Sequence, residues 1–259
     1  MQIHPIRSSV SDNWFYLLAT DDGRDGLLID PVDAPAALSA ARGAGVEVTK
    51  VINTHWHPDH VAGNEAVLQA TSAQLFVPAG ESSLIAGNGV GLEEGGELQV
   101  GDHVLRVLLT PGHTQAHISL LSGDHLFSGD VVFAAGAGNC RFGDPLTLCR
   151  TFRQIIAALP DSTVFYPGHD YAVRNLEFAL HLQPGHAPAL EELDRSRGDS
   201  QLRLRTLGQE RQYNPFLRMD EPDLQDRLRS HHAEAWDAAA GRTDAERAFV
   251  ATRALRNHW

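Results

Sequence analysis

The stretch "NTHWHPDHVAGN", residues 53–64, places three histidines and an aspartate within six consecutive positions. It follows an apolar segment that predicts a short buried strand and precedes a segment, 61–71, of helical character. Pro58 suits the first turn of a helix, which would put Asp59 and His60 at the N-terminus of that helix. Imidazole nitrogens and carboxylate oxygens are common ligands of divalent metals. The stretch therefore predicts a metal site at a strand-to-helix turn.

Three further segments run from an apolar strand into a loop that carries a histidine or an aspartate: "VLLTPGH" ends at His113, "LFSGD" at Asp130 and "VFYPGH" at His169. Side chains at the ends of adjacent strands can converge although they lie far apart in the sequence. Five histidines and two aspartates suit two divalent metals, and the Asp130 carboxylate could bridge them. Taken alone, Asp130 could equally be a turn residue. The candidate ligands are His55, His57, Asp59, His60, His113, Asp130 and His169.

The chain has fourteen histidines, and those outside this set are expected to be solvated or hydrogen-bonded side chains. His186 repeats the "PGH" sequence, but it lies between two helical segments and no strand precedes it. We interpret it as a histidine of a helix hairpin. The others in this class are His4, His103, His117, His125, His181, His231, His232 and His258.

The composition is that of a globular protein, with 42% hydrophobic and 21% charged residues in a chain of 259. The formal net charge of -12 disfavours nucleic acid or an anionic membrane as the main partner, because phosphate binding usually needs a basic surface. The N-terminus lacks a signal-peptide pattern and no run approaches the roughly 18 apolar residues of a membrane span, so a cytoplasmic protein is expected. Cys140 and Cys149 are too few for a disulfide framework and are expected to be idle thiols. Either a monomer or a small homo-oligomer is expected.

Strands and helices alternate along the first 170 residues, which favours a layered α/β fold. Strands are predicted at 14–20, 26–31, 50–54, 74–78, 103–109, 117–122, 125–130 and 162–167, and helices at 34–45, 61–71 and 145–160. After about Tyr171 hardly any strand pattern remains, while segments such as 173–182 and 187–197 are typical of helices. We therefore predict a first domain over 1–170 and a helical C-terminal domain over 171–259.

The motifs "THWHPDH", "TPGHT", "SGD" and "YPGHDY" resemble those of the metallo-β-lactamase fold hydrolases. Within that superfamily, "NWFYLL", "IDPVDAP", "VRNLEFALHLQPG" and "QYNPFLR" resemble landmarks of the glyoxalase II enzymes, or hydroxyacylglutathione hydrolases, nearly from end to end. The resemblance implies a four-layer αββα sandwich with its metals at one edge of the paired sheets, followed by a helical substrate-binding domain. It also implies that His55, His57 and His113 hold one metal, that Asp59, His60 and His169 hold the other, and that Asp130 bridges the two.

A dinuclear centre of this kind implies a thioester hydrolase. Two divalent cations activate a bridging water as the nucleophile and polarise the substrate carbonyl. Asp59 and Asp130 are the expected catalytic residues, with the metal-bridging hydroxide as the nucleophile. A thiolate whose conjugate acid has a pKa of about 8.5 leaves without a general acid. The expected reaction is hydrolysis of S-D-lactoylglutathione to D-lactate and glutathione, or of a related thioester. Zinc is the expected metal, although iron and manganese accept the same ligands.

The expected substrate contacts match the family only in part. Tyr171 and Arg256 fall on positions where the family binds glutathione. The loop "AGAGNCRFGDP" instead puts Asn139 and Arg141 where the family has a lysine and a tyrosine, and Trp259 replaces a further lysine. Arg141 could replace a lost cation, since arginine grips carboxylates bidentately, or it could be a solvated surface residue. The thiol carrier is therefore less certain than hydrolysis itself.

Three other functions are compatible with the motifs. A persulfide dioxygenase of the same fold uses one iron, held by two histidines and an aspartate, and this chain has more ligands than such a site needs. A phosphodiesterase would use the same two metals, but the acidic charge disfavours polynucleotides. The metals could also have a purely structural role in a non-catalytic binding domain, although structural metal sites are usually closed by protein ligands.

Overall fold

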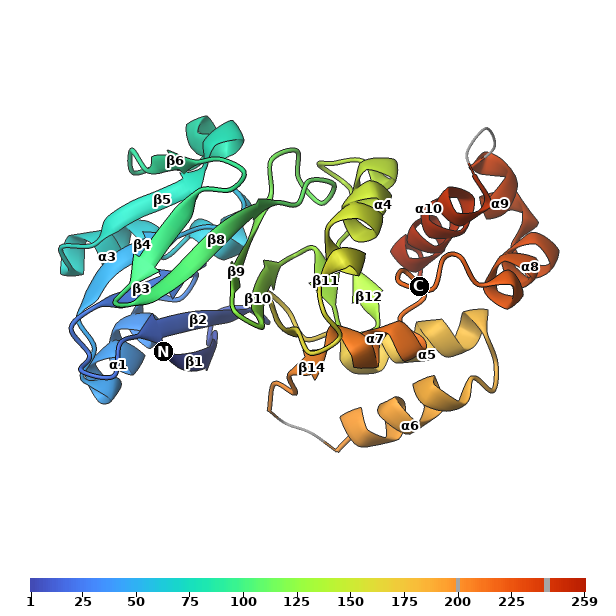
Figure 1. The fold of residues 1–259 in the computed structure, drawn as a ribbon, viewed down its shortest axis with the longest axis horizontal. Helices are drawn as coiled ribbons and strands as arrows, with labels where there is room; N and C mark the ends of the chain where they lie inside the picture. Colours follow the sequence, from blue (N-terminus) through green and yellow to red (C-terminus); the bar gives the residue numbers. More distant parts are fainter. Residues whose placement is uncertain (199–200, 240–242) are drawn as a thin grey trace. The chain divides into compact units, whose positions relative to one another are not determined.

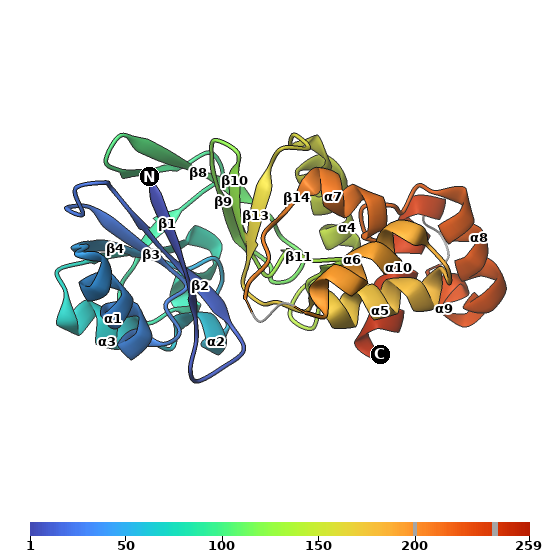
Figure 2. The same cartoon turned by 90° about the horizontal axis from the view of Figure 1, so that it is seen from below.

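The computed structural model describes residues 1–198, 201–239 and 243–259 (Figures 1 and 2). The chain forms two compact units, and each is discontinuous in sequence. The first unit consists of Met1–Thr110, Gln115–Asp130 and Tyr166–Asp170, and the second of Pro111–Thr114, Val131–Phe165 and Tyr171–Trp259. Among the described residues, no helix is both long and apolar enough to span a membrane.

Six strands form the first sheet of the first unit, in the order β1-β2-β3-β4-β5-β6. They are β1 (Gln2–Arg7), β2 (Trp14–Ala19), β3 (Gly26–Ile29), β4 (Val48–Ile52), β5 (Gln74–Pro78) and β6 (Val90–Leu92). β1, β2 and β3 pair in antiparallel fashion, whereas β3 to β6 are parallel. Because Tyr16 pairs with Ile29, the start of β2 lies beside the end of β3. The end of β4 lies at the same edge, since β3 and β4 are parallel.

Helices connect the parallel strands of this sheet. α1 (Ala34–Ala44) follows β3, begins at the side-chain cap of Asp33 and ends at Gly45, which has a φ of 68°. Between β4 and β5 the predicted helix 61–71 is in fact two helices, α2 (Pro58–Val61) and α3 (Asn64–Ala70). The break lies at Gly63, which packs so closely on the carbonyl of Pro31 that a Cβ there would collide with it. Asp59 and His60 are therefore inside their own short helix.

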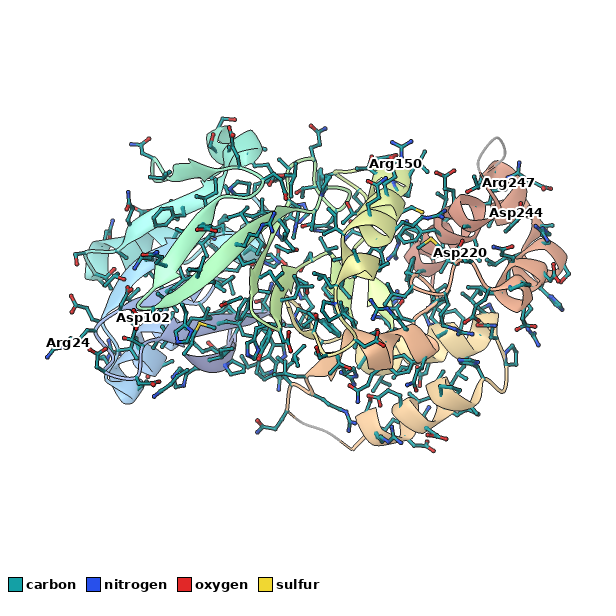
Figure 3. All side chains as sticks on the ribbon, viewed as in Figure 1. Arg24, Asp102, Arg150, Asp220, Asp244 and Arg247 are labelled. Atoms are coloured by element: carbon teal, nitrogen blue, oxygen red, sulfur yellow. The ribbon has the colours of Figure 1, made fainter. Side chains whose placement is uncertain are left out.

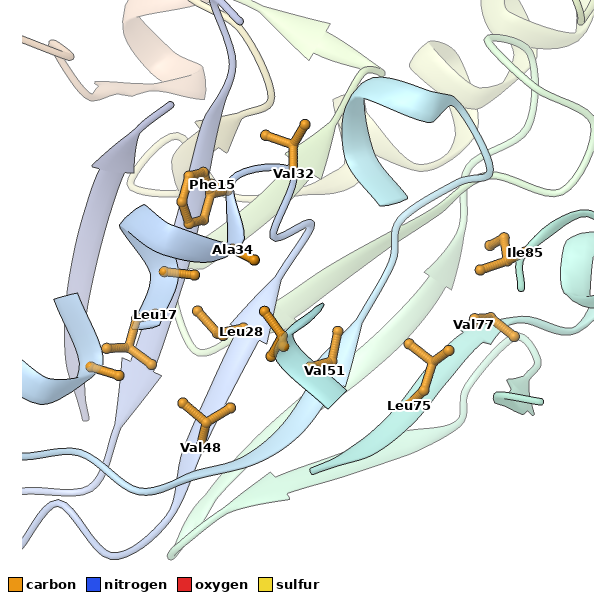
Figure 4. Packing of buried hydrophobic residues seen from close by; sticks show 13 residues of the cluster. Phe15, Leu17, Leu28, Val32, Ala34, Val48, Val51, Leu75, Val77 and Ile85 are labelled. Atoms are coloured by element: carbon orange, nitrogen blue, oxygen red, sulfur yellow. The ribbon is translucent and has the colours of Figure 1, made fainter. Parts of the chain in front are cut away.

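The core of the first unit lies between the first sheet and its helices. Figure 4 shows Leu17, Leu28, Val51, Leu75 and Val77 projecting from four neighbouring strands into one apolar cluster, which the small side chains of α1 also join. Fully burying each large aliphatic side chain contributes about 1.5–3 kcal/mol. This packing fixes the strands, and so fixes the loops at their ends.

The second sheet has the order β14-β13-β10-β9-β8-β7. Its strands are β7 (Glu97–Val100), β8 (His103–Leu109), β9 (Ile118–Ser122), β10 (His125–Gly129), β13 (Val164–Pro167) and β14 (Arg205–Thr206), and a 3₁₀ helix, η1 (Ala79–Leu84), precedes them. β7 to β10 form an antiparallel meander in the first unit. The boundary between the units passes through β13, whose last residues, Tyr166 and Pro167, belong to the first unit. The hydroxyl of Tyr16 donates to the carbonyl of Pro167 at 2.6 Å.

The second unit is mainly helical. Its helices are α4 (Pro145–Gln154), η2 (Ile156–Ala158), α5 (Ala172–Leu182), α6 (Ala187–Ser196), α7 (Leu207–Tyr213), α8 (Pro222–His231), α9 (Ala233–Ala238) and α10 (Asp244–Asn257), and a hairpin of β11 (Val132–Phe133) and β12 (Gly136–Ala137) lies among them. Phe152 on α4 packs edge-on against Phe249 on α10, with ring centroids 5.3 Å apart. Charged side chains such as Arg150 and Asp244 lie on the exposed faces of these helices (Figure 3).

The eight predicted strands are present as β2, β3, β4, β5, β8, β9, β10 and β13. The predicted helix 145–160 ends at Gln154 and continues only as a 3₁₀ turn. The hairpin of β11 and β12 was not predicted, because two-residue strands carry no alternating pattern. The predicted α/β fold with sheets flanked by helices and a helical C-terminal region is confirmed.

Candidate metal centre

The loop after β4 brings two imidazoles together. His55 is fully buried, and its Nε2 lies 3.0 Å from Nδ1 of His57. A cation bound at about 2.0–2.1 Å from each of two ligands in a tetrahedral site would separate those ligands by about 3.3 Å. The spacing of the two nitrogens therefore fits two ligands of one metal.

Four side chains from three separate loops of the first unit form a second cluster. Nε2 of His169 lies 3.3 Å from Oδ2 of Asp59 and 3.5 Å from Oδ2 of Asp130. Nε2 of His60 lies 3.3 Å from the other Asp130 oxygen and 3.9 Å from Oδ2 of Asp59. These separations exceed the about 2.7–2.9 Å of a direct charge-assisted hydrogen bond, and they match the spacing of ligands around one cation.

The predicted ligands of the first unit thus form groups that can hold divalent cations. The potential ligand atoms of Asp59, His60 and His169 lie within 4.8 Å of one another, and so do those of His55, His60 and Asp130. Asp130 belongs to the second group and also faces His169, which is the position that a bridging carboxylate needs. The mixed nitrogen and oxygen donors suit zinc, iron or manganese.

Three of the predicted ligand histidines, His55, His60 and His169, are oriented through their Nδ1 atoms. Nδ1 of His60 is 3.0 Å from Oδ2 of Asp30, and Nδ1 of His169 is 3.1 Å from Oδ1 of Asp12. The hydroxyl of Thr54 donates to Asp30, so it can only accept from Nδ1 of His55, which lies 3.0 Å away. In all three rings the proton is therefore held on Nδ1 and Nε2 faces the cluster. Outer partners of this kind fix the tautomer and raise the basicity of a metal ligand.

The sequence interpretation missed Asp30, although it follows the same rule as the predicted ligands. "GLLID" is an apolar strand that runs directly into an aspartate. Asp30 is buried, has a φ of 54°, and accepts from both the backbone and the side chain of Thr54 at 2.7 Å. Asp30 also lies in the landmark "IDPVDAP", but neither signal assigns it a role at the metal centre.

Two glycines of the motifs are required by the packing of the site. At Gly168, a Cβ would collide with Oδ1 of Asp130 and approach Cε1 of His60 to 2.7 Å. At Gly129, where φ is 47°, a Cβ would lie 2.5 Å from Oγ1 of Thr54. The loops of "SGD" and "YPGH" can therefore approach the cluster only without side chains at these positions.

Two further buried side chains hold the backbone of the site. His117, which was placed among the solvated or hydrogen-bonded histidines, is buried and accepts the N–H of Asp130 on Nε2 at 3.2 Å. Glu81 accepts the N–H of Trp56 at 3.1 Å and that of Ala116 at 2.9 Å. Both fix loops that carry predicted ligands, and neither belongs to a recognised motif.

The charges within the cluster stabilise one another. Burial opposes protonation of His169, but Asp130 and Asp59 outweigh it and raise the pKa of His169 to about 10. Burial likewise opposes protonation of His60, while the carboxylates of Asp130 and Asp30 raise its pKa well above the usual value. The nearby imidazole of His169 lowers the pKa of Asp59. A divalent cation would compete with these protons for the same nitrogen atoms, so its binding would release protons.

The remaining predicted site residues lie in the second unit. His113 donates from Nδ1 to the carbonyl of Asn139 at 2.7 Å. The Asn139 side chain in turn accepts the N–H of the exposed Arg141 at 3.1 Å. The ring of Tyr171 packs edge-on against Phe133, and Nε of Arg256 donates to Asn175 at 2.9 Å. The shared role of His113 with His55 and His57 stays a prediction.

Polar side chains from the C-terminal helices hold the β11–β12 hairpin of the second unit. The carboxylate of Glu210 accepts the N–H of Ala135 at 2.7 Å, and the side chain of Asn214 donates to the carbonyl of Gly136 at 3.1 Å. Arg253 donates to the carbonyls of Ala137 at 2.6 Å and Gly138 at 3.2 Å. The loop that follows, with Asn139 and Arg141, therefore takes its shape from α7 and α10.

Comparison with known proteins agrees with this geometry. Residues 10–169 match the model of the metallo-beta-lactamase superfamily, and residues 170–259 match that of the hydroxyacylglutathione hydrolase C-terminus. A hydroxyacylglutathione hydrolase of Polaromonas sp. is 41% identical over 254 residues, which cover 95% of each chain. The chain belongs to the hydroxyacylglutathione hydrolase family.

Further members of the hydroxyacylglutathione hydrolase family are also similar over most of their length. The enzyme of that name from Nitrosococcus oceani is 38% identical over 254 residues, again 95% of each chain. Among solved structures, ETHE1 from Myxococcus xanthus superposes with a TM-score of 0.69 and 27% identity, over 99% of this chain and 100% of that one. The family and fold predicted from the sequence motifs are therefore confirmed.

Proposed function

We propose that this protein is a dinuclear-metal hydrolase of glutathione thioesters, with S-D-lactoylglutathione as the substrate and D-lactate and glutathione as the products. The position of Asp130 carries the proposal. One of its oxygens lies 3.3 Å from Nε2 of His60 and the other lies 3.5 Å from Nε2 of His169. Asp130 also shares a group of potential ligand atoms, all within 4.8 Å of one another, with His55, a proposed ligand of the other cation, so its carboxylate suits a bridge between two cations. The names of the family relatives support the thioester as substrate.

In this proposal, seven side chains hold two divalent cations, most favourably zinc, with iron or manganese as the other suitable metals. His55, His57 and His113 would hold one cation, Asp59, His60 and His169 the other, and Asp130 both. When bound, the two cations would lower the pKa of a water molecule to near neutrality and polarise the thioester carbonyl.

The side chains of the site then have distinct tasks. Asp30 holds the proton of His60 on Nδ1, so that Nε2 keeps its lone pair for coordination. Asp59, which is about half exposed, is the acidic ligand nearest to solvent and so to an incoming substrate. The N–H of Asp130 is held by His117, which supports the bridging role proposed for this carboxylate. No side chain is needed to protonate the leaving group, because a thiolate leaves readily near neutral pH.

The proposed substrate contacts come from the second unit. Arg256 would bind a glutathione carboxylate, since its Nε bond to Asn175 fixes the plane of the guanidinium group. Tyr171, Asn139 and the exposed Arg141 are the other proposed contacts. In this scheme residues 1–170 form the catalytic domain, and residues 171–259 form a substrate-binding domain that contributes Tyr171 and Arg256. We also propose a cytoplasmic location, which suits two cysteines that form no disulfide, and a monomer or small homo-oligomer.

Metal analysis and thioester hydrolysis, measured on the same sample, test the proposal. We expect about two metal ions per chain and thiol release from S-D-lactoylglutathione. His169→Gln should reduce both bound metal and hydrolysis. His186→Gln is the matched control, because His186 shares the "PGH" sequence but lies at the start of α6, where its Nε2 contacts the carbonyl of Gln212.

A preparation with both metals bound that hydrolyses no glutathione thioester would overturn the proposed reaction. One iron per chain together with oxygen consumption would support a persulfide dioxygenase instead. Hydrolysis of a phosphodiester in preference to the thioester would support a phosphodiesterase.

A further inference from the structure

Asn13, the first residue of "NWFYLL", lies against three predicted ligands of the second cluster, although the sequence motifs assigned it no role. Its Nδ2 atom is 3.4 Å from Oδ2 of Asp59, 3.4 Å from Nε2 of His60 and 3.2 Å from Nε2 of His169. The residue is 1% exposed. A buried amide surrounded by two imidazoles and a carboxylate needs an explanation, because buried polar groups normally satisfy their hydrogen-bonding capacity.

The backbone fixes the position of this amide. Asn13 forms an isolated antiparallel bridge with His169, and its carbonyl accepts the N–H of Ser8 at 3.0 Å. The next residue, Trp14, donates its N–H to the carbonyl of Gly168 at 2.8 Å. The side chain of Asn13 can therefore turn about its own bonds but cannot move away from the cluster.

The distances place the amide at a ligand position. The ligand atoms of Asp59, His60 and His169 lie 3.3 to 3.9 Å from one another where the structure gives their separations. The distances from Asn13 to the same three atoms, 3.2 to 3.4 Å, are within about 0.1 Å of that range. A cation about 2.0–2.2 Å from those three atoms would therefore also be close to the Asn13 amide.

The chemistry of the neighbours favours oxygen at this point. An amide nitrogen only donates, whereas the amide oxygen has lone pairs, and a half-turn of the side-chain amide exchanges the two. His60 and His169 each hold a carboxylate on Nδ1, so Nε2 is left to bind a cation. Beside a bound cation the amide oxygen is favoured over the nitrogen, because only the oxygen has lone pairs. Within the described residues, Oδ1 of Asn13 is buried without a hydrogen-bond partner.

We propose that Asn13 is an additional ligand of the metal centre, and that its amide oxygen coordinates the cation held by Asp59, His60 and His169. This inference rests on the proposed function, because it needs a cation at that site. It adds a neutral oxygen ligand from Asn13, which directly precedes β2, to predicted ligands that otherwise follow the ends of strands. The added ligand would raise the coordination number without changing the net charge of the site.

The test compares Asn13→Leu, which has a similar volume but no ligand atom, with Asn13→Asp, which keeps an oxygen in the same place. Zn²⁺ affinity is measured for each full-length protein by competition with a chromophoric chelator, and the Co²⁺-substituted forms are compared by visible absorption. Asn64→Leu is the matched control, since Asn64 is a buried amide of the same unit whose side chain bonds to that of Asn53.

We expect Asn13→Leu to weaken the less tightly bound Zn²⁺ by about tenfold or more, the scale of loss when a metal site loses a supporting partner. Its Co²⁺ absorption should intensify, because a lower coordination number absorbs more strongly. Asn13→Asp should bind Zn²⁺ at least as tightly as the wild type. Asn64→Leu should have the Zn²⁺ affinity and Co²⁺ spectrum of the wild type.

The inference is wrong if Asn13→Leu keeps the wild-type affinity and Co²⁺ spectrum, or if Asn13→Asp loses as much affinity as Asn13→Leu. Both results would leave the proposed function intact, provided that the wild type binds two metals and hydrolyses the thioester. A wild type that binds no Zn²⁺ would overturn the inference and the proposed function together. Thermal unfolding of the variants with excess chelator shows whether the fold itself is preserved.

Discussion

His113 donates a hydrogen bond from Nδ1 to the carbonyl oxygen of Asn139 over 2.7 Å. Since a carbonyl can only accept, the proton is fixed on Nδ1, and Nε2 is the ring atom able to coordinate a metal. Asn139 directly follows Gly138, whose carbonyl is held by Arg253 on α10. A C-terminal helix thus shapes the loop on which a predicted metal ligand depends.

Replacement of Arg253 by methionine should destabilise the protein. Arg253 is 5% exposed, and burial, which is the main cause, lowers the pKa of its guanidinium to about 10. The variant leaves two buried carbonyls without their donor, and each costs about 1–3 kcal/mol. Urea unfolding should therefore show a loss of about 2–4 kcal/mol in the free energy of unfolding. Arg150→Met, on the exposed face of α4, should change it by less than about 0.5 kcal/mol. Equal effects of the two changes would contradict the prediction.

Asp30→Asn should weaken metal binding and leave the fold intact. Asparagine tolerates the positive φ of 54° at this position, and it can still accept the N–H of Thr54. It cannot accept from both Thr54 and His60, so His60 loses the partner that fixes its tautomer. We expect a loss of about 10- to 100-fold in metal affinity, measured by chelator competition. Asp33→Asn, which alters another buried aspartate that caps α1, should not change the affinity.

Glu210 should make the stability of the protein fall as the pH rises from about 4.5 to 7. Burial raises the pKa of Glu210 from 4.5 to about 7 in the folded protein. In that window the unfolded chain releases the proton while the folded protein keeps it, so the unfolded state gains stability as the pH rises. The shift corresponds to about 3 kcal/mol between pH 4.5 and 7, and the difference stays constant above pH 7.

Urea unfolding of the wild type and of Glu210→Gln at several pH values checks this. The variant should gain stability relative to the wild type by up to about 3 kcal/mol as the pH rises through that window. Glu191→Gln is the control, because Glu191 is mostly exposed on α6 and its replacement should give a nearly flat difference. If the difference in the free energy of unfolding between Glu210→Gln and the wild type also did not change with pH, Glu210 would already be ionised in the folded protein at low pH.

Arg141→Ala should raise the KM for a glutathione thioester. The Arg141 side chain is exposed, and its backbone N–H is bonded to Asn139, so the side chain extends from an ordered turn. Loss of a charge-assisted hydrogen bond of about 1.5 kcal/mol predicts an increase of about tenfold in KM. The KM for a thioester that lacks the peptide should not change. Equal increases for both substrates would show that Arg141 does not bind the peptide.

Much of the candidate metal centre could be predicted because the candidate ligands follow apolar strands. The ends of β4 and β10 are readable from their sequence alone, and so are the histidines and aspartates that follow them. Asp30 obeys the same rule at the end of β3 and was available to the same reasoning. Asp12 and Asn13 could not be found in this way, because they precede β2 instead of following it. They reach the same edge only because β2 runs antiparallel to β3.

The side-chain contacts that support the β11–β12 hairpin also could not be predicted from the sequence. Glu210, Asn214 and Arg253 lie more than 70 residues from the backbone groups that they bind. Each is a polar residue in a helical segment, where a solvated side chain is the usual expectation. Only the tertiary packing of the second unit shows that these side chains point inward.

The composition of the second unit has a consequence for recombination between relatives. The two family models meet between residues 169 and 170, which looks like a natural point for exchange of gene segments. However, the hairpin residue Ala137 and its donor Arg253 would then come from different parents, as would the paired rings of Phe152 and Phe249. A chimaera joined at that point could fold well only if both parents had kept these partners. A chimaera that folds well should therefore take residues 131–259 from a single parent.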